Sequence, residues 1–196
     1  MVSEAYEQVE VESRGEWRAW LEAHHARAPG VWVVTYKKAE GSRHVPYGDV
    51  VEEALCFGWV DSRGQRLDDA RWMLLLTPRR PGSGWSRPNK QRIERLRAAG
   101  LMEPAGLAAV AAAEADGSWT ALDAIEDLVE PDDLRAALDA DADARREWDG
   151  FPRSAKRAIL EWVLSAKRPE TRARRVAETA EQAAQGLRAN QRPRKP

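Results

Sequence analysis

Residues 31–36 of this chain are Val31-Trp32-Val33-Val34-Thr35-Tyr36, and the predicted fold of its first half is built around them. β-branched and aromatic residues fill the stretch, and Glu40-Gly41-Ser42 follows it, so it predicts a buried strand. Residues 59–61 (WVD) and 71–76 (RWMLLL) have the same character and predict two further strands, with a turn near residues 62–64. Together these segments predict a small, mainly antiparallel sheet.

Helices are expected wherever apolar residues recur at helical spacing between capping and stop signals. The sequence predicts them over residues 14–27, 46–57, 87–99, 104–115, 132–139, 142–148, 154–167 and 169–185. We therefore predict an α+β fold with three parts. A mixed N-terminal part with the sheet and packed helices covers 1–102, an all-helical C-terminal part covers 103–187, and a disordered tail covers 188–196.

Composition limits the classes of protein that fit this chain. The 196 residues are 43% hydrophobic and carry 31 basic against 32 acidic residues, so global charge favours neither nucleic acid nor membrane. Cys56 has no second cysteine to pair with, and no run of about 18 apolar residues occurs. A cytoplasmic protein that does not cross a membrane is predicted. Its oligomeric state is left open.

Charge is unevenly distributed along the chain. Residues 77–97 hold seven basic residues and one acid, residues 114–149 hold thirteen acids and three arginines, and residues 151–196 hold twelve basic residues and four acids. The acidic segment either neutralises one or both basic segments or leaves one basic face free for an anionic ligand. Lys37 and Lys38, at the end of the first predicted strand, either help to bind such an anion or protect a strand edge from pairing.

Residues 79–86 (RRPGSGWS) form the most informative loop in the sequence. Gly82 and Gly84 let backbone amides approach a ligand, and the arginines add positive charge ahead of a helix that Ser86 can cap. The loop therefore predicts an anion cradle, although it has neither the P-loop nor the dinucleotide-binding pattern. The alternative is a solvated basic loop that pairs with the acidic segment.

Asp61 is the candidate for acid–base chemistry. Between Trp59 and Arg66 it is either a buried carboxylate with a raised pKa or an ordinary turn cap or arginine partner. Cys56 is expected in the core. The three histidines do not stand at metal-binding spacing, so neither a metal nor a cofactor is predicted.

Four blocks of sequence resemble one bacterial family. They are residues 53–61 (EALCFGWVD), residues 77–81 (TPRRP) with Trp85, Ser86 and Asn89, residues 102–106 (MEPAG) and residues 165–172 (SAKRPETR). With these blocks the chain resembles the YdeI/OmpD-associated, bacteriocin-protection family over residues 13–187, departing from its pattern at Val60 and Glu103. The resemblance implies a role in stress or antimicrobial protection and carries over no catalytic residue.

These observations favour a protein that sequesters a small aromatic or anionic molecule in a cleft lined by tryptophan and arginine. The predicted ligand-binding residues are Trp59, Asp61, Trp72, Arg79, Arg80, Trp85, Ser86 and Asn89. One alternative is an enzyme that inactivates such a molecule with Asp61 as the acid or base. Another is nucleic-acid binding through residues 79–97 and 153–175.

Overall fold

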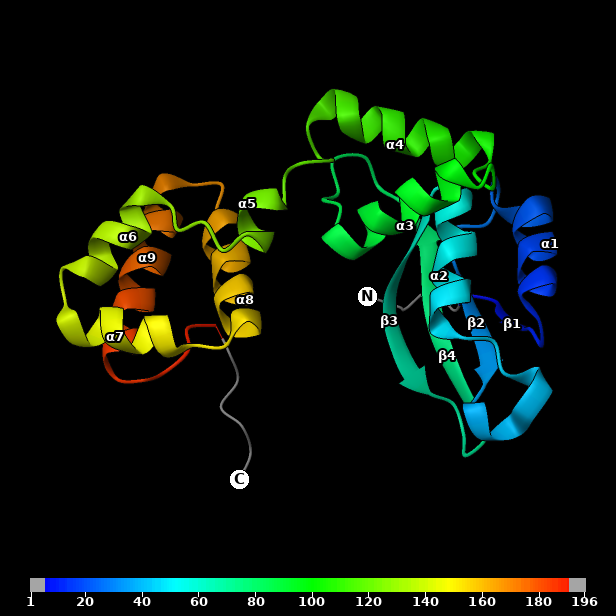
Figure 1. Ribbon diagram of the computed structural model, residues 1–196, viewed down its shortest axis with the longest axis horizontal. Coiled ribbons are helices and arrows are strands. Elements are labelled where there is room, and N and C mark those ends of the chain that lie inside the picture. The colour runs from blue at the N-terminus through cyan, green and yellow to red at the C-terminus, as the bar shows by residue number, and fades with distance from the viewer. Residues whose placement is uncertain (1–5, 191–196) are drawn as a thin grey trace. The chain divides into compact units, whose positions relative to one another are not determined.

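A computed structural model describes residues 6–190 (Figure 1). The chain forms two compact units, residues 1–121 and 122–196. The first contains a sheet and helices, and the second is helical throughout its described residues, so the predicted α+β fold is confirmed.

The sheet of the first unit has four strands, in the order β1-β2-β4-β3. They are β1 (Gln8–Glu10), β2 (Val31–Tyr36), β3 (Trp59–Arg66) and β4 (Arg71–Pro78). β1 pairs with β2 in parallel and the other two pairings are antiparallel. The predicted turn near residues 62–64 is wrong, because β3 continues through them with a bulge between Asp61 and Gly64. The chain reverses instead at Asp68, whose Oδ1 accepts hydrogen bonds from the amides of Ala70 and Arg71.

The helices of the first unit are α1 (Arg14–His24), the 3-10 segment η1 (Lys38–Arg43), α2 (Tyr47–Cys56), α3 (Arg87–Ala98) and α4 (Pro104–Asp116). Alternate residues of the strands point to opposite faces of the sheet. Val31, Val33, Leu74 and Leu76 pack with the helices in the larger core. Trp32, Val34, Met73 and Leu75 form a smaller cluster on the other face.

The first unit extends past residue 102, where the sequence predicts its end. A Cβ atom added at Gly106 of α4 would lie 2.2 Å from the carbonyl oxygen of Cys56, so α4 lies directly on the end of α2. The amide of Glu103 donates to the same carbonyl oxygen at 3.1 Å. This close packing assigns α4 to the first unit, and Cys56 is buried as predicted.

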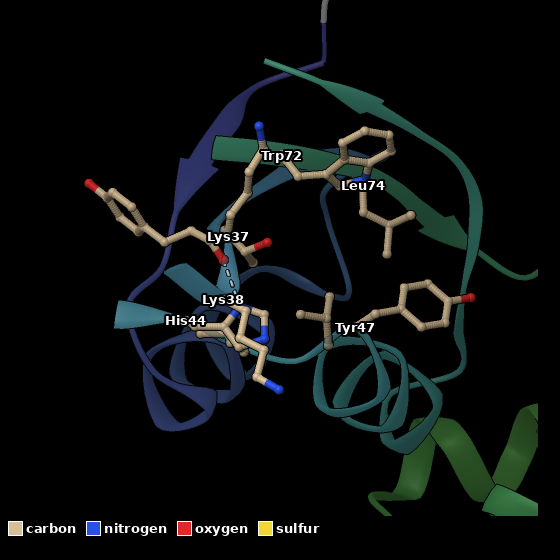
Figure 2. A pocket seen from close by; sticks show the side chains of 10 residues that line it. Lys37, Lys38, His44, Tyr47, Trp72 and Leu74 are labelled. Carbon is tan, nitrogen blue, oxygen red and sulfur yellow. Dashed lines mark hydrogen bonds between the residues drawn. The ribbon is translucent and has the colours of Figure 1, made fainter. Parts of the chain in front are cut away.

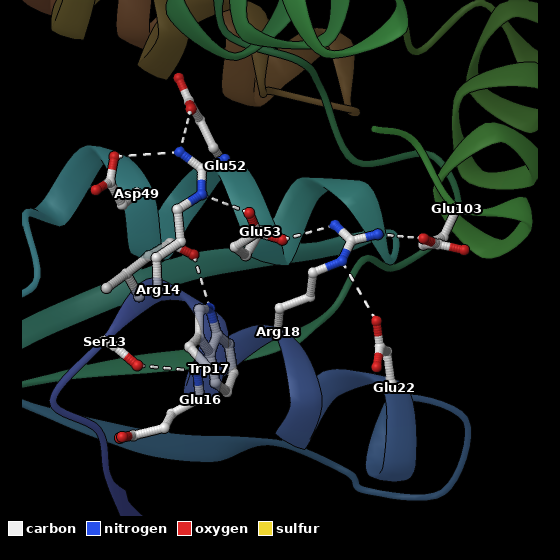
Figure 3. Close-up of polar contacts among 11 residues, drawn as sticks. Ser13, Arg14, Glu16, Trp17, Arg18, Glu22, Asp49, Glu52, Glu53 and Glu103 are labelled. Carbon is white, nitrogen blue, oxygen red and sulfur yellow. Dashed lines mark hydrogen bonds and ion pairs between the residues drawn. The ribbon is translucent and has the colours of Figure 1, made fainter. Parts of the chain in front are cut away.

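An ionic cluster joins α1, α2 and the residue before α4 (Figure 3). Glu53, which is 3% exposed, accepts from Arg14 Nε at 2.5 Å and from Arg18 Nη1 at 2.8 Å. Arg18 also donates to Glu103. No local pattern in the sequence predicts this cluster, because its members come from three separate segments of the chain.

The second unit contains α5 (Asp123–Glu126), α6 (Asp132–Asp139), α7 (Ala142–Gly150), α8 (Arg153–Leu164) and α9 (Pro169–Ala184). Its core includes Leu134, Trp148 and Ile159. Ala189 is 1% exposed in the same core, so the predicted disorder is wrong at this residue, while residues 191–196 lie outside the described part of the chain. None of the described helices is long and apolar enough to span a bilayer.

Candidate functional site

In the loop over residues 79–86, several hydrogen-bond donors bind acceptors of the protein itself. The amide of Gly82 donates to Asp116 Oδ2 at 3.2 Å, and both the amide and the hydroxyl of Ser83 donate to the carbonyl oxygen of Arg80. The Gly82 and Ser83 donors that the predicted anion cradle would use are therefore engaged within the protein. The cavity beside the loop has a volume of about 80 Å³.

Arg79 stabilises this loop through contacts within it. Its guanidinium lies 3.6 Å from the ring centroid of Trp85 and donates to the carbonyl oxygen of Gly84 at 2.8 Å. Burial lowers the pKa of Arg79 to about 10, against the opposing charge of Asp61. Trp85 itself is 2% exposed, so its ring is in contact with protein rather than available to a ligand. Arg80 is exposed.

The other predicted ligand-binding residues lie in different surroundings. Trp59 is 1% exposed, and its indole donates to the carbonyl oxygen of His25 at 3.3 Å. Ser86 occupies the N-cap position of α3 without a side-chain capping bond, and Asn89 accepts from Arg92 at 2.9 Å. Trp72 lines a different pocket from Arg79 and Trp85. The predicted set is thus divided between the core, the loop and a second site.

That second site is a pocket between the sheet and the beginning of α2, which we call the Trp72 pocket (Figure 2). Its volume is about 290 Å³. Figure 2 shows Trp72 and Leu74 on the sheet side of the pocket and Tyr47 on the helix side. The full lining is Thr35, Tyr36, Lys37, Lys38, His44, Val45, Tyr47, Val50, Trp72 and Leu74.

The alternation of β4 explains why Trp72 lies here. Trp72 shares a face with Leu74 and Leu76, and Leu76 belongs to the core beneath the helices. Trp72 lies near the other end of the strand and is 44% exposed. Its indole rests against β3 at Gly64, where an added Cβ would approach Nε1 to 2.7 Å.

Tyr47 is the first residue of α2 and is 55% exposed. Its hydroxyl donates to Asp61 Oδ2 at 2.8 Å. Partial burial and this hydrogen bond raise the pKa of Tyr47 to about 12, so the phenol stays protonated at neutral pH. Asp61 is half-buried beside the pocket, bound to a neighbouring side chain rather than enclosed by aromatic rings.

Lysine side chains supply the formal charge of the pocket lining. Lys37 Nζ donates to the carbonyl oxygens of Asp68 and Asp69 at 3.1 and 2.8 Å, which are neutral acceptors. Lys38 is exposed, and within residues 6–190 neither lysine forms an ion pair. β1 pairs with β2 only at residues 32–34, short of the two lysines, so the alternative that they protect a strand edge stays a prediction.

The carboxylates near these lysines are already paired with arginines. Asp68 accepts from Arg71 Nε at 2.8 Å, and Glu40 accepts from Arg43 at 3.1 Å. Asp69 forms an ion pair with Arg66. At this end of the pocket the two lysine charges are therefore not neutralised by these carboxylates.

His44 completes the polar side of the pocket. Its Nδ1 lies 2.7 Å from the carbonyl oxygen of Tyr36, and because a carbonyl only accepts, Nδ1 carries the hydrogen. Nε2 is then the ring atom left to accept a hydrogen bond when the ring is neutral.

The fold and the pocket define a two-unit α+β protein with a candidate ligand site in its first unit. Residues 9–109 match a family described as a domain of unknown function (DUF8412), which is more than half of the chain, and the chain belongs to that family. Residues 127–186 match the family described as bacteriocin-protection, YdeI or OmpD-associated. No curated protein and no solved structure matches the chain.

The two matches divide the predicted resemblance. The bacteriocin-protection match is confirmed over the second unit and includes residues 165–172. Residues 53–61 and 77–81, which also carried the resemblance, fall within the other match. The Trp72 pocket lies wholly inside residues 9–109.

Proposed function

We propose that the first unit binds a small, flat, anionic aromatic molecule in the Trp72 pocket. The observation that carries the proposal is that two exposed aromatic side chains, Trp72 and Tyr47, and two lysines line the same apolar pocket. This ligand class agrees with the class that the sequence predicts, although the residues that bind it differ.

The size of the pocket supports a small ligand. An apolar cavity of about 150 Å³ accommodates benzene, and pockets for drug-sized molecules begin near 300 Å³. The Trp72 pocket, at about 290 Å³, suits one or two fused rings. Leu74, Val45 and Val50 supply the apolar surface that such rings require.

The charge of the pocket supports an anion. Lys37 and Lys38 carry the formal charge of the lining, the carboxylates beside them bind arginines, and Asp61, at the Tyr47 end, accepts the Tyr47 hydroxyl. A carboxylate on the ligand therefore meets positive potential without displacing an existing ion pair.

Sequestration is the activity that fits these features in a cytoplasmic stress or antimicrobial-protection protein. The family matched by residues 127–186 carries a bacteriocin-protection description, and binding alone removes a toxic molecule without turnover. Nucleic-acid binding has less support, because several arginines of the two basic segments form ion pairs with carboxylates of the protein itself. Arg95 binds Glu52, Arg97 binds Glu114, Arg157 binds Glu126 and Arg172 binds Asp133.

Calorimetric titration with 2-naphthoate and with uncharged 2-naphthamide tests the proposal. We expect saturable binding of the acid, weaker binding of the amide, and a shift of the Trp72 indole N–H signal in a nitrogen–proton NMR spectrum. Trp72→Leu should weaken 2-naphthoate binding at least about tenfold, because a large stacking surface is lost. Leu67→Ala, which trims another exposed apolar residue of the first unit, is the matched control. Absence of binding, or equal binding by Trp72→Leu, overturns the proposal.

A further inference from the structure

The geometry points to Asp61 as a positioning residue that makes the Trp72 pocket selective for flat ligands, by holding the Tyr47 ring in place as one wall. This inference rests on the proposed function, since it assigns a selectivity to the same pocket. Asp61 acts through Tyr47 and need not touch the ligand.

The Tyr47 ring has a single polar anchor among the described residues. It lies at the start of α2 and is 55% exposed, and no ring contact with another aromatic side chain holds it. The 2.8 Å hydrogen bond to Asp61 joins its hydroxyl to a carboxylate, which is a stronger acceptor than a neutral oxygen. Without that bond the ring is free to adopt other staggered rotamers.

The bulge in β3 decides which residue follows Asp61 on the face that looks toward α2. Asp61 pairs with Leu76 and Gly64 pairs with Leu74, so residues three apart in β3 share the face that looks toward α2. In a regular strand, residues 61 and 63 would share that face. The bulge thus puts Gly64 where Arg63 would otherwise lie.

Arg63 confirms this change of face. Its guanidinium lies 5.3 Å from the ring centroid of Trp32, which belongs to the cluster on the opposite face of the sheet. Gly64 then leaves room for the Trp72 indole, since any side chain there would collide with it. The bulge therefore makes room for the Trp72 wall, while Asp61, which precedes the bulge on the same face, holds the Tyr47 wall.

Two fixed walls discriminate by shape. Figure 2 shows Trp72 on the sheet side of the pocket and Tyr47 on the helix side. We expect a flat bicyclic acid to lie against these rings where they stand, and a globular acid of similar volume to push the Tyr47 ring aside. Displacing Tyr47 breaks its hydrogen bond to the Asp61 carboxylate. The loss of that bond therefore weakens the binding of the globular ligand and not that of the flat one.

The experiment measures the ratio of dissociation constants for adamantane-1-carboxylate and 2-naphthoate, two acids of like charge and different shape. We expect the wild type to favour 2-naphthoate, and Asp61→Ala to reduce this preference by about fivefold or more, as loss of a charge-assisted hydrogen bond implies. Asp61→Asn, which keeps an acceptor oxygen, should restore part of it. Ser62→Ala, in the exposed part of the same strand, should leave it unchanged.

A double-mutant cycle separates positioning from a general structural effect. If Asp61 acts through the Tyr47 hydroxyl, Asp61→Ala has no further effect on the ratio in a Tyr47→Phe background. An equal effect of Asp61→Ala in both backgrounds, or no effect in either, overturns the inference. In that case, binding of 2-naphthoate by the wild type still supports the proposed function. Failure of the wild type to bind 2-naphthoate overturns both. Thermal unfolding of each variant confirms that it is folded.

Discussion

Arg18 and Glu53 form a hydrogen-bonded ion pair between α1 and α2, with 2.8 Å from Nη1 of the arginine to Oε2 of the glutamate. The second oxygen of Glu53 accepts from Arg14, and the glutamate side chain is only 4% exposed (Figure 3). A carboxylate in such surroundings is tolerated because two guanidinium groups compensate its charge. The pair holds the two helices that cover the sheet.

Glu53→Gln should therefore lower the free energy of unfolding of the first unit by about 3 kcal/mol, because two partly buried arginines lose their shared counter-charge. Urea unfolding followed by tryptophan fluorescence measures the change. Glu22→Gln removes an exposed partner of Arg18 and should cost less than about 1 kcal/mol. Equal effects of the two substitutions would contradict this account.

Gly106→Ala should destabilise the contact between α4 and α2. The new methyl group would lie within 3 Å of the carbonyl oxygens of Cys56 and Leu55, so the helices must separate, at a cost of about 2 kcal/mol or more. Gly15→Ala, in α1 with no atom near its Cβ position, should be neutral or stabilising. Thermal unfolding of both variants gives the comparison. A stable Gly106→Ala protein would show that α4 is not packed in this way.

Tyr47 predicts a dependence of stability on alkaline pH. Its pKa is about 12 in the folded protein and near 10 in the unfolded chain, so its contribution is complete below pH 10. As the pH rises from 10 to 12 the unfolded chain loses the proton first, and stability falls. Urea unfolding at pH 9 and pH 11 should show a smaller loss for Tyr47→Phe than for the wild type. Identical losses would mean that Tyr47 has no raised pKa.

Cys56 should be inert in the folded protein. Burial, with the nearby charge of Glu53, raises the pKa of its thiol to about 11, so almost no thiolate exists at pH 8. We expect a disulfide reagent such as 5,5′-dithiobis(2-nitrobenzoate) to react only as the first unit unfolds, and immediately in urea. Rapid labelling under native conditions would show that the thiol is accessible.

Lys38→Met should weaken binding of 2-naphthoate by about two- to fivefold, the effect of one solvent-exposed charge, and leave binding of 2-naphthamide unchanged. Added salt should reduce the difference. Lys167→Met removes an exposed lysine from the second unit and serves as the matched control. Equal weakening of acid and amide would assign Lys38 a packing role instead of an electrostatic one.

Much of the secondary structure can be predicted from local signals. Ser13 caps α1, accepting a hydrogen bond from the Glu16 amide, and runs of β-branched, aromatic and apolar residues identify β2 and β4 near their observed bounds. These elements depend on neighbouring residues alone. The bulge at Asp61 and Gly64 has no comparable signal, because it depends on how β3 pairs with β4. The predicted turn at residues 62–64 is wrong for that reason.

The candidate site shows the same division. Trp72 was predicted to bind a ligand and lines the pocket, and Asp61 lies beside it, whereas Tyr47 and Gly64 were missed. The position of Trp72 on the face of Leu74 and Leu76 was readable from the alternation of β4. The role of Tyr47 has no such local signal, because its hydrogen bond to Asp61 joins α2 to β3.

Local patterns suffice to predict the α+β class, most helix and strand positions and the burial of Cys56, since hydrophobic periodicity and capping act over a few residues. Only the tertiary fold shows which of the predicted tryptophans lines the pocket. Trp59 and Trp85 are covered by elements distant in the chain, while Trp72 lies beside the first turn of α2 and stays exposed. Exposure depends on what packs against a side chain, and packing is settled only when the whole unit has folded.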